Sequence, residues 1–561
     1  MKKFLSLLLA LTLVLGLFAG CGNSNNGEDN TQNNGSNNAG NTADDAGAAN
    51  AGDVTFHYMI GAEPPGLDPS ISQGDVQQSI YQALFEGLVT MDTEGNIAPA
   101  AATEWSVSDD GLVYTFKLRE DAVWSDGQPV TANDFVYAWQ RVLDPNTAST
   151  YSWFVEMFLK NATAFAQGEV GAEELGVKAV NDYTLEVTLA SPATYFIQAL
   201  LLGCWLPVRQ DAVEANPDQW VYNADTCISN GPFCLEEYQI GSHISLVKND
   251  KYWGADEVSI DKVKFTFMSG STTALAAFRA GDVDGFSGVP TEDLVDIITT
   301  DNRLYTFDRL SFSFLRLNTA TEGLDNPLVR RAINLGIDRQ AYMDGLGQGL
   351  TNTPALGTVP SGMMLDGKDF REVAGDHGLS TSAQIEEAQA LLAEAGYPNG
   401  EGLPTYRLHC TTDARESAEV LQQMLETNLG IKTEILPVDS KLNWPMITEG
   451  DYDISYGGWG GDYTHPNTFL NLFTSTAYDN CTGWSNAEFD QLIADAAVET
   501  DEAKQLEMLV KAEDILMEES PIVPLMFPTT TLMMQDYVTD WYLSAFNVLY
   551  IRNAKVDRPA A

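Results

Sequence analysis

The chain has 561 residues, of which 44% are hydrophobic and 19% charged, so it is long enough to form more than one hydrophobic core. It carries 30 basic and 79 acidic residues, which gives a formal net charge of −49 at neutral pH. Nucleic acid and anionic lipid surfaces are therefore poor partners. Diffuse acidity serves solubility, and it does not by itself define a cationic ligand.

The first residues have the pattern of an export signal. Lys2 and Lys3 precede the apolar run FLSLLLALTLVLGLFAG, which stops at Cys21. This run is shorter than the roughly 20 residues of a membrane-spanning helix, and its charge-then-apolar order is typical of a signal peptide. The junction FAGC resembles a bacterial lipobox, in which the cysteine is lipidated, although Phe18 replaces the usual leucine. We expect a lipoprotein signal over 1–21; the alternative is a plain secretory signal.

Residues 22–52 contain no aromatic and no large aliphatic side chain. Gly, Asn, Ala and Asp cannot bury enough apolar area to offset the entropy of ordering, so this segment is expected to be a flexible tether. A lipid anchor followed by a tether would hold a folded body at the extracytoplasmic face of the cell membrane.

The body begins with patterns of half-buried strands. In LVYTFKLRE the residues Leu112, Tyr114, Phe116 and Leu118 share one face, and TLEVTLA repeats this alternation. Both segments are predicted to be antiparallel strands. Between them, Asp126–Gly127 marks a turn, and Thr131 or Asn133 is the expected cap of a helix that runs through Arg141.

After about residue 327, amphipathic helices alternate with short strands, which predicts an α/β lobe. In TSAQIEEAQALLAEAGYP, Thr381 and Gln384 have capping-box spacing, and Gly396 and Pro398 end the helix. The other expected helices are NPLVRRAINLGID, ESAEVLQQMLETNLG, NAEFDQLIADAAVE and EAKQLEMLVKAEDILMEE, and the expected strands are IKTEILPV, YDISYGGW and PIVPLMF.

No cofactor is expected from the remaining motifs. Five cysteines follow Cys21, but no CxxC occurs, and the five histidines show no HExxH or similar spacing. A G-x-G-x-x-G motif and a P-loop are also absent from the sequence. A structural metal site is therefore not expected.

The segment GGWGGDYTHPNTFLNLF, residues 457–473, places Asp462 between Trp459 and Tyr463 on a glycine-rich backbone. Asp462 could be a catalytic acid, a metal ligand with His465, a helix cap or a cradle for a charged ligand. Spacing alone favours a cap for the helix near NTFLNLF. The glycines would allow another backbone to approach closely.

The chain resembles a known family from about residue 54 to 555. The most specific block is ALFEGLVTMDTEGNIAPAAATEWSVSDDGLVYTFKLREDAVWSDGQPVTANDFVYAWQRVLDPNTAS, followed in family order by SNGPFCLEEY, VRRAINLGIDRQ, ALLAEAGYP and GGWGGDYTHPNTFLNLF. These blocks resemble the family 5 bacterial extracellular solute-binding proteins of peptide ABC importers, and DFVYAWQRVLDPNTAS is most similar to the oligopeptide-binding members.

This resemblance implies an α/β fold of the bilobed, periplasmic-binding-protein-like type II class, with three domains and a ligand cleft between the lobes. The implied domain I is discontinuous, domain II is inserted into it, and domain III is the α/β domain. The expected ranges are 53–85, 208–310 and 528–561 for domain I, 86–207 for domain II and 311–527 for domain III.

The resemblance also implies the site. Asp462 matches the position that takes the ligand's α-ammonium, and Trp459 matches an aromatic wall of a side-chain pocket. Tyr151 matches a second-domain residue that meets the peptide from across the cleft. The remaining expected ligand-binding residues are Gly74, Asp75, Gly460, Tyr463 and Arg415.

The chain departs from the family where some relatives anchor the ligand's carboxylate with basic residues. Tyr456, Ile447 and Thr448 are uncharged at such places. Arg415, Arg309 and Arg316 are the candidate replacements. A cysteine that some relatives carry is Gly460 here, so their disulfide is absent, and a bridge between Cys410 and Cys481 is a possible substitute.

The leading hypothesis is a lipid-anchored, monomeric binding protein, not an enzyme, that delivers peptides to ABC permease subunits and contacts the membrane only through its anchor. An alternative keeps the fold but binds another solute, such as a dipeptide, nickel, haem, a sugar or a signalling peptide. A remote alternative is a carboxylate-pair glycosidase, suggested by 11 Trp and 21 Tyr residues in an acidic chain.

Overall fold

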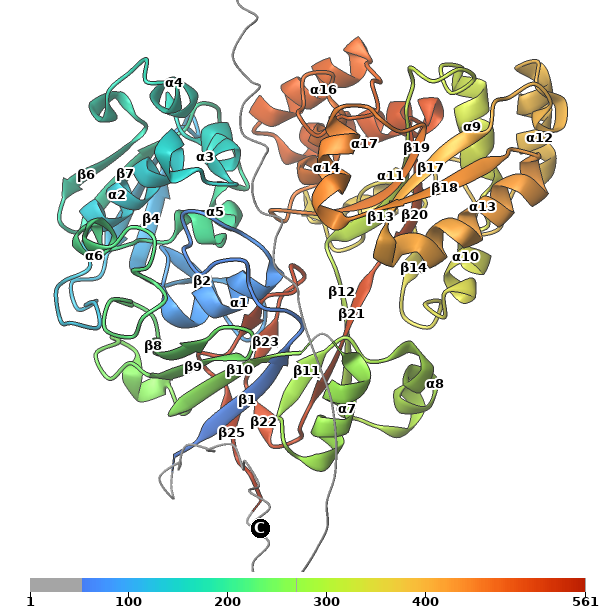
Figure 1. Ribbon diagram of the computed structural model, residues 1–561. Coiled ribbons are helices and arrows are strands. Elements are labelled where there is room, and N and C mark those ends of the chain that lie inside the picture. Colours follow the sequence, from blue (N-terminus) through green and yellow to red (C-terminus); the bar gives the residue numbers. More distant parts are fainter. Residues whose placement is uncertain (1–52, 269, 560–561) are drawn as a thin grey trace, which may run out of the picture. The chain divides into compact units, whose positions relative to one another are not determined.

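The computed structural model describes residues 53–268 and 270–559, so the expected signal peptide, Cys21 and the tether lie outside the described residues. Three large β-sheets of seven, six and four strands carry most of the helices (Figure 1). Among these residues, none of the helices combines the length and the apolarity that crossing a membrane requires. The strands of the small two-stranded sheets are β2 (Val89–Met91), β3 (Ile97–Pro99), β15 (Met364–Leu365), β16 (Lys368–Asp369), β22 (Val538–Thr539), β23 (Tyr542–Leu543), β24 (Leu549–Tyr550) and β25 (Lys555–Val556).

The seven-stranded sheet joins early and late parts of the chain in the order β12-β21-β11-β1-β10-β9-β8. Strand β1 is parallel to β10 and β11, and β21 lies antiparallel between β11 and β12. Its strands are β1 (Thr55–Ile60), β8 (Phe233–Gln239), β9 (His243–Lys248), β10 (Lys262–Phe267), β11 (Gly285–Ser287), β12 (Leu304–Asp308) and β21 (Thr529–Met534), and the nearby helices are α1 (Asp75–Leu84), α7 (Ser271–Ala280) and α8 (Thr291–Thr300).

The four-stranded sheet is antiparallel throughout, in the order β4-β5-β7-β6, as the alternating sequence patterns predict. Thr131 caps helix α2, and its backbone N–H donates to the Asp134 carboxylate at 2.7 Å. The elements are β4 (Ala102–Val107), β5 (Val113–Leu118), β6 (Val177–Asn181), β7 (Thr184–Thr188), α2 (Ala132–Leu143), α3 (Ser152–Phe158), α4 (Ala162–Ala166), α5 (Phe196–Ala199) and α6 (Gln210–Ala215).

The six-stranded sheet is mixed, in the order β14-β20-β13-β19-β17-β18. Strand β17 is parallel to β18 and β19, whereas β13 is antiparallel to β19 and β20. The predicted α/β lobe is confirmed. Its elements are β13 (Ser311–Leu317), β14 (Thr353–Pro354), β17 (Tyr406–Thr411), β18 (Thr433–Val438), β19 (Ile454–Gly460), β20 (Ile522–Phe527), α9 (Pro327–Gly336), α10 (Arg339–Gly345), α11 (Phe370–Ala374), α12 (Ile385–Glu394), α13 (Arg415–Leu429), α14 (Ser440–Thr448), α15 (Asn467–Leu470), α16 (Ala487–Val498) and α17 (Glu502–Glu519).

The predicted start of helix α12 is wrong. The helix begins at Ile385, its N-cap is Gln384, and no side chain caps it. The Thr381 carbonyl instead accepts the Gln340 N–H at 3.1 Å, and the Gln384 N–H donates to Leu335 at 2.8 Å. Tertiary hydrogen bonds thus hold this segment outside the helix, so the capping-box spacing has no effect here.

The aromatic residues mostly pack the hydrophobic cores. The seven-stranded and four-stranded sheets share one core, and the six-stranded sheet has a second. Trp124, Trp139, Trp205 and Trp220 are fully buried in the first core. The high aromatic content therefore reflects packing and does not by itself indicate a sugar-binding surface.

The cysteines of the described body are free thiols. Cys410 is buried on β17 and Cys481 lies in a partly buried loop, and neither is bonded to a second cysteine among residues 53–268 and 270–559. The bridge proposed between them is therefore wrong. The other free cysteines are Cys204, Cys227 and Cys234.

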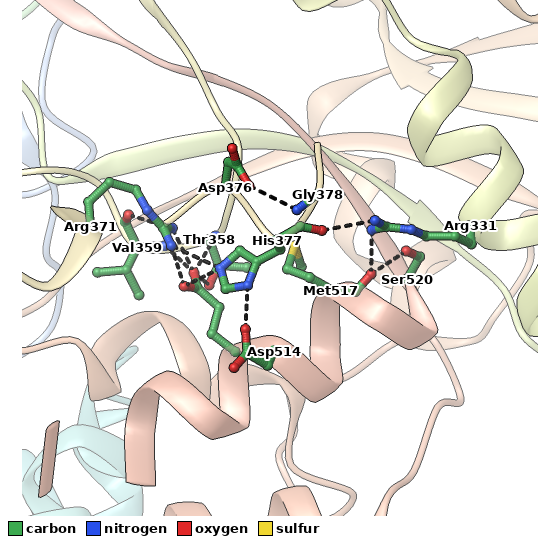
Figure 2. A network of polar contacts seen from close by, with 11 residues as sticks. Arg331, Thr358, Val359, Arg371, Asp376, His377, Gly378, Asp514, Met517 and Ser520 are labelled. Atoms are coloured by element: carbon green, nitrogen blue, oxygen red, sulfur yellow. Dashed lines mark hydrogen bonds and ion pairs between the residues drawn. The ribbon is translucent and has the colours of Figure 1, made fainter. Parts of the chain in front are cut away.

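A buried ionic network ties helix α17 to α11 and to the segments on both sides of α11. The Glu513 carboxylate is fully buried and accepts hydrogen bonds from Thr358 N–H at 2.7 Å and from Arg371 Nη2 at 2.7 Å. His377 Nε2 lies 2.9 Å from Glu513, and its Nδ1 lies 2.7 Å from Asp514. Figure 2 shows Arg371, His377 and Asp514 converging there. Burial alone would raise the pKa of Glu513, but Arg371 and His377 outweigh it and hold the pKa well below its usual range.

Candidate functional site

Part of one edge of strand β19 is unpaired among the residues that the structure describes. It pairs with β13 along its whole length, from Ile454 to Gly460. On its other side it pairs with β17 only at Ile454 and Ser455. Within the described residues, the edge from Tyr456 to Gly460 therefore has no neighbouring strand.

The hydrogen bonding of β19 shows which backbone groups face this open edge. Gly461 N–H donates to the Leu310 carbonyl at 2.7 Å, toward β13. Backbone groups alternate between the two sides of a strand in an antiparallel pair. The N–H and C=O groups of Gly458 and Gly460 and the C=O group of Tyr456 therefore face the open edge, whereas the Tyr456 N–H takes part in the pairing with β17 at Ser455. A β-carbon at Gly460 would meet no heavy atom within 4 Å, so a second backbone has room to approach.

Asp462 follows this edge by two residues, and its side chain is buried, with the residue 8% exposed. Its Oδ1 accepts a hydrogen bond from the Tyr151 hydroxyl at 3.1 Å, and its N–H donates to Thr468 Oγ1 at 3.0 Å. The N-cap of α15 is Pro466, and Asp462 accepts no bond from that helix. The helix-cap interpretation, favoured by spacing alone, is therefore wrong.

Within the described residues, the Asp462 carboxylate has no cationic partner. No Lys, Arg or His forms an ion pair with it in the part of the chain that the structure describes. Burial raises the pKa of Asp462 to about 7; the Tyr151 hydrogen bond opposes this, and Asp479 adds to it. A buried anion without a counter-charge is costly, so this position favours a ligand that brings a positive charge.

Trp459 and Tyr463 flank Asp462 in different environments. Trp459 packs against the second core, and its Nε1 is buried without a hydrogen-bond partner among the described residues. The ring of Tyr463 is fully buried and stacks on Tyr195, with centroids 4.4 Å apart and an interplanar angle of 8°. The Tyr463 ring thus fixes the loop that carries Asp462, while the Trp459 indole keeps an unused donor.

Tyr151 reaches Asp462 from a distant part of the sequence. It is the N-cap residue of α3, and its hydrogen bond to Asp462 spans 311 residues of sequence. Burial, Asp462 and, more weakly, Asp75 raise the pKa of the Tyr151 hydroxyl. The hydroxyl therefore stays protonated and donates to the carboxylate.

Gly74 and Asp75 lie at the start of α1, where Gly74 is the N-cap. The Asp75 carboxylate is already paired, because it accepts from Arg309 Nη2 at 2.6 Å and from Asn547 Nδ2 at 3.2 Å. A β-carbon at Gly74 would lie 2.7 Å from Gln77 Oε1. Asp75 is thus a partner of Arg309, which leaves Arg309 less available to a ligand.

Arg415 lies apart from the residues above. It begins α13, its side chain is 60% exposed, and it pairs with Glu419 at 2.8 Å along the same helix. No contact joins it to Asp462, Trp459 or Tyr151 among the described residues. Its predicted role as a ligand residue therefore has no geometric support.

The metal interpretation of His465 has no support in the described residues. Burial lowers the pKa of His465 to about 4, and its Nε2 lies 3.2 Å from Gln505 Oε1. Among residues 53–268 and 270–559, no group of three His, Cys, Asp or Glu side chains is placed to hold a metal ion. His465 also stacks on Tyr195 at 4.6 Å, so it belongs to the packing around the loop.

Comparisons with known proteins identify the family of the chain. The family model described as "Bacterial extracellular solute-binding proteins, family 5 Middle" matches residues 96–480. The oligopeptide-binding protein OppA of Bacillus subtilis (strain 168) is 32% identical over 511 residues, covering 90% of this chain and 93% of that protein. The dipeptide-binding protein DppE of the same bacterium is 33% identical over 487 residues, covering 86% of this chain and 88% of that protein.

Solved structures give the same result. The structure of Listeria monocytogenes OppA bound to peptide matches with a TM-score of 0.76 and 31% identity, covering 91% of this chain and all of that chain. An oligopeptide-binding protein of Borrelia burgdorferi matches with a TM-score of 0.78 and 31% identity, covering 90% of this chain and 99% of that chain. The predicted α/β, type II binding-protein fold is confirmed. The chain belongs to the family 5 bacterial extracellular solute-binding proteins.

Proposed function

We propose that the protein captures peptides outside the cytoplasm and delivers them to the permease of an ABC importer. One observation carries this proposal: the buried Asp462 carboxylate has no cationic partner among the described residues and follows an unpaired strand edge. The relatives compared above include proteins named for oligopeptide and dipeptide binding, which supports the same ligand class. The family consists of solute-binding proteins, which supports binding rather than catalysis.

A peptide can add to the open edge of β19 as a further strand. Its backbone would bond to the N–H and C=O groups of Gly458 and Gly460 and to the C=O group of Tyr456, which any peptide sequence can do. Its terminal ammonium would lie at Asp462, so the ligand would run antiparallel to β19. This arrangement recognises what all peptides share and leaves the side chains to tolerant pockets.

The neighbouring side chains have supporting roles in this proposal. Tyr151 orients the Asp462 carboxylate through its 3.1 Å hydrogen bond. Trp459 offers its unpaired Nε1–H to a ligand carbonyl and walls one side-chain pocket. Tyr463 acts through packing on Tyr195, and it holds the loop in place.

Peptide binding is expected to release a proton below neutral pH. The pKa of Asp462 is about 7 without ligand, so at pH 6 the Asp462 carboxyl is protonated in most of the protein molecules. The bound ammonium requires the ionised carboxylate, so binding must release this proton. We therefore expect about 0.9 proton released per peptide at pH 6, and affinity that falls up to about tenfold per unit as pH decreases further. Titration calorimetry in buffers of different ionisation enthalpy measures this number.

The N-terminal amine of the peptide limits the affinity at high pH. Its pKa of about 7.7–8.0 means that affinity also falls above roughly pH 8.5, where the ammonium is lost. A peptide acetylated at its N-terminus is the matched control, and it should bind far more weakly. Equal binding of the free and acetylated peptides at pH 7, with no proton released at pH 6, would contradict the proposed function.

We further propose that Cys21 is lipidated and anchors the protein at the extracytoplasmic face of the membrane. The basic, apolar and Cys21 pattern of the N-terminal segment supports this, although the segment lies outside the described residues. Cys21→Ser is expected to abolish labelling by palmitate and to move the protein from the membrane to the soluble fraction. Unchanged labelling or unchanged membrane association in the variant would exclude the anchor.

The proposed organisation follows the expected domains. Domain I would comprise 53–85, 208–310 and 528–561, with domain II at 86–207 and domain III at 311–527. The body would act as a monomer, and its ligand would lie between the lobes. Support comes from the separate cores of the six-stranded sheet and the other two large sheets.

A further inference from the structure

Arg316 is a buried cation to which the described part of the chain supplies no ion-pair partner. It lies on β13, opposite Ser455 of β19, and it is 5% exposed. Within the described residues its guanidinium forms no ion pair, and no hydrogen bond to it is present, although it has five donor N–H groups. Burial lowers the pKa of Arg316, and Tyr452, Cys481 and Asp479 oppose this only in part.

Two other buried arginines of the same lobe show the usual arrangement. Arg330 donates to the carbonyls of Glu519 and Leu324, each at 2.9 Å. Arg339 donates to the carbonyls of Ala355 and Pro524 at 2.8 and 2.9 Å. These two side chains are structural. Arg316 differs from both, because its donors are left for another partner.

The Arg316 guanidinium lies over strand β19, close to the open edge. A β-carbon at Gly457 would collide with Arg316 Nη1, so the guanidinium occupies the space above this glycine. Its Cζ lies 4.5 Å from the Phe314 ring centroid and 6.0 Å from that of Trp444. Gly457 thus makes room for a cation between two aromatic rings, beside the edge where a peptide would add.

The groups around Arg316 do not neutralise it. The Asp479 carboxylate raises the pKa of Arg316, but no ion pair joins the two side chains. Burial also raises the pKa of Asp479 itself. Tyr452 donates to the Cys481 carbonyl at 2.5 Å. His409 is fully buried, and its pKa is lowered by burial. An anion from outside would therefore find an uncompensated guanidinium.

The distance along β19 predicts where a bound peptide meets Arg316. Gly457 precedes Asp462 by five residues. At about 3.4 Å per residue, this separation is about 17 Å, which a peptide of four or five residues spans when extended. A ligand with its ammonium at Asp462 would therefore carry its later residues to Arg316.

We propose that Arg316 binds a carboxylate of the ligand, and that it makes this receptor selective for peptides with an acidic group at about the fourth or fifth residue. The group is either the C-terminal carboxylate of a short peptide or an acidic side chain of a longer one. This proposal rests on the proposed peptide-binding function. Arg316 would also supply the basic group that some relatives carry at the positions of Tyr456, Ile447 and Thr448, which are uncharged here.

The test uses three alanine-based pentapeptides and titration calorimetry with the full protein. The first has a free C-terminal acid, the second is its C-terminal amide, and the third is an amide with glutamate in the second half. Wild type is expected to bind the first peptide roughly ten- to a hundredfold more tightly than the second, the range for a charge-assisted hydrogen bond. Preference for the third peptide over the second would instead identify a side-chain carboxylate.

Arg316→Gln is expected to abolish these preferences, and Arg316→Lys to keep part of them, because lysine retains the charge but not the fork of donors. Arg407→Gln is the matched control; it removes an arginine of the same lobe that Asp451 already pairs at 2.6 Å and should leave the preferences unchanged. Equal binding of all three peptides by wild type overturns the proposal without using any variant. So does a preference that persists in Arg316→Gln.

The failure of this proposal is distinct from failure of the proposed function. If the three peptides bind alike but Asp462→Ala abolishes their binding, the site binds peptides and Arg316 has no part in selection. If none of the three binds to wild type, the peptide-binding function itself is wrong.

Discussion

Asp462→Ala is expected to weaken peptide binding by about 2–5 kcal/mol, the range for removing one partner of a desolvated charge pair. The reason is that the ligand's ammonium would be enclosed at a buried position beside Tyr151 and Asp462. Among the described residues, no other carboxylate contacts Tyr151, so the variant would leave the ammonium without a counter-charge. Titration calorimetry at pH 7 with a mixed peptide pool or a defined pentapeptide measures the loss.

Two controls separate this effect from general damage. Asp413→Ala removes an exposed aspartate of the same lobe and should leave affinity unchanged. An N-acetylated peptide lacks the ammonium, so its weak binding should hardly differ between wild type and Asp462→Ala. If Asp462→Ala binds the free peptide as tightly as wild type does, Asp462 is not the ammonium anchor.

Glu513→Gln is expected to destabilise the lobe around the six-stranded sheet by about 3–5 kcal/mol, the cost of breaking a buried ion pair by removing one partner. The substitution keeps the shape of the side chain but leaves Arg371 buried without its counter-charge. Urea unfolding at pH 7 measures the change. Asp514→Asn is the matched control; its side chain is 58% exposed, so a loss below about 1 kcal/mol is expected.

The same network predicts a dependence on pH. The folded-state pKa of Glu513 lies below its unfolded value, so its contribution to stability is present above the unfolded pKa of about 4.3 and is lost as pH falls. The difference between wild type and Glu513→Gln should therefore be smaller below pH 4 than at pH 5. A difference that stays the same at pH 3 would show that the carboxylate charge is not what stabilises the lobe.

The strands, helices and fold class could largely be predicted because they depend on local patterns. The alternation in YDISYGGW predicts β19, and this strand places Asp462 just beyond its end. The helical periodicity of NPLVRRAINLGID likewise predicts α9. Helix boundaries were less predictable, since the start of α12 depends on hydrogen bonds to Leu335 and Gln340, which are distant in sequence.

Pairing between charged side chains could not be predicted in the same way. Asp75 and Asp462 are both aspartates beside glycines, yet Arg309 and Asn547 pair with Asp75 from 234 and 472 residues away. Asp462 has no such cation among the described residues. Tyr463 resembles a ligand contact in the sequence, but the Tyr195 ring covers it. Whether a polar side chain is free is a property of the tertiary structure.

The sequence predicts the position of Arg316 in its strand but not its lack of an ion pair. Its position after Phe312 and Phe314 on alternate residues places it on the same face of β13 as two core aromatics, which the sequence already indicates. That no carboxylate of the described residues forms an ion pair with it depends on the loop that carries Asp479, far along the chain. The sequence could name it as a candidate, but only the three-dimensional arrangement distinguishes it from Arg330 and Arg339.

The central claim, that this protein carries peptides held at Asp462, is tested most directly by native mass spectrometry. The protein would be purified without denaturation and measured before and after incubation with a mixed peptide pool, alongside Asp462→Ala. We predict a series of adducts with peptide masses on wild type, enriched in acidic species, and their loss from the variant. A single adduct of non-peptide mass, such as nickel, haem or a sugar, together with no uptake from the pool, would contradict the claim.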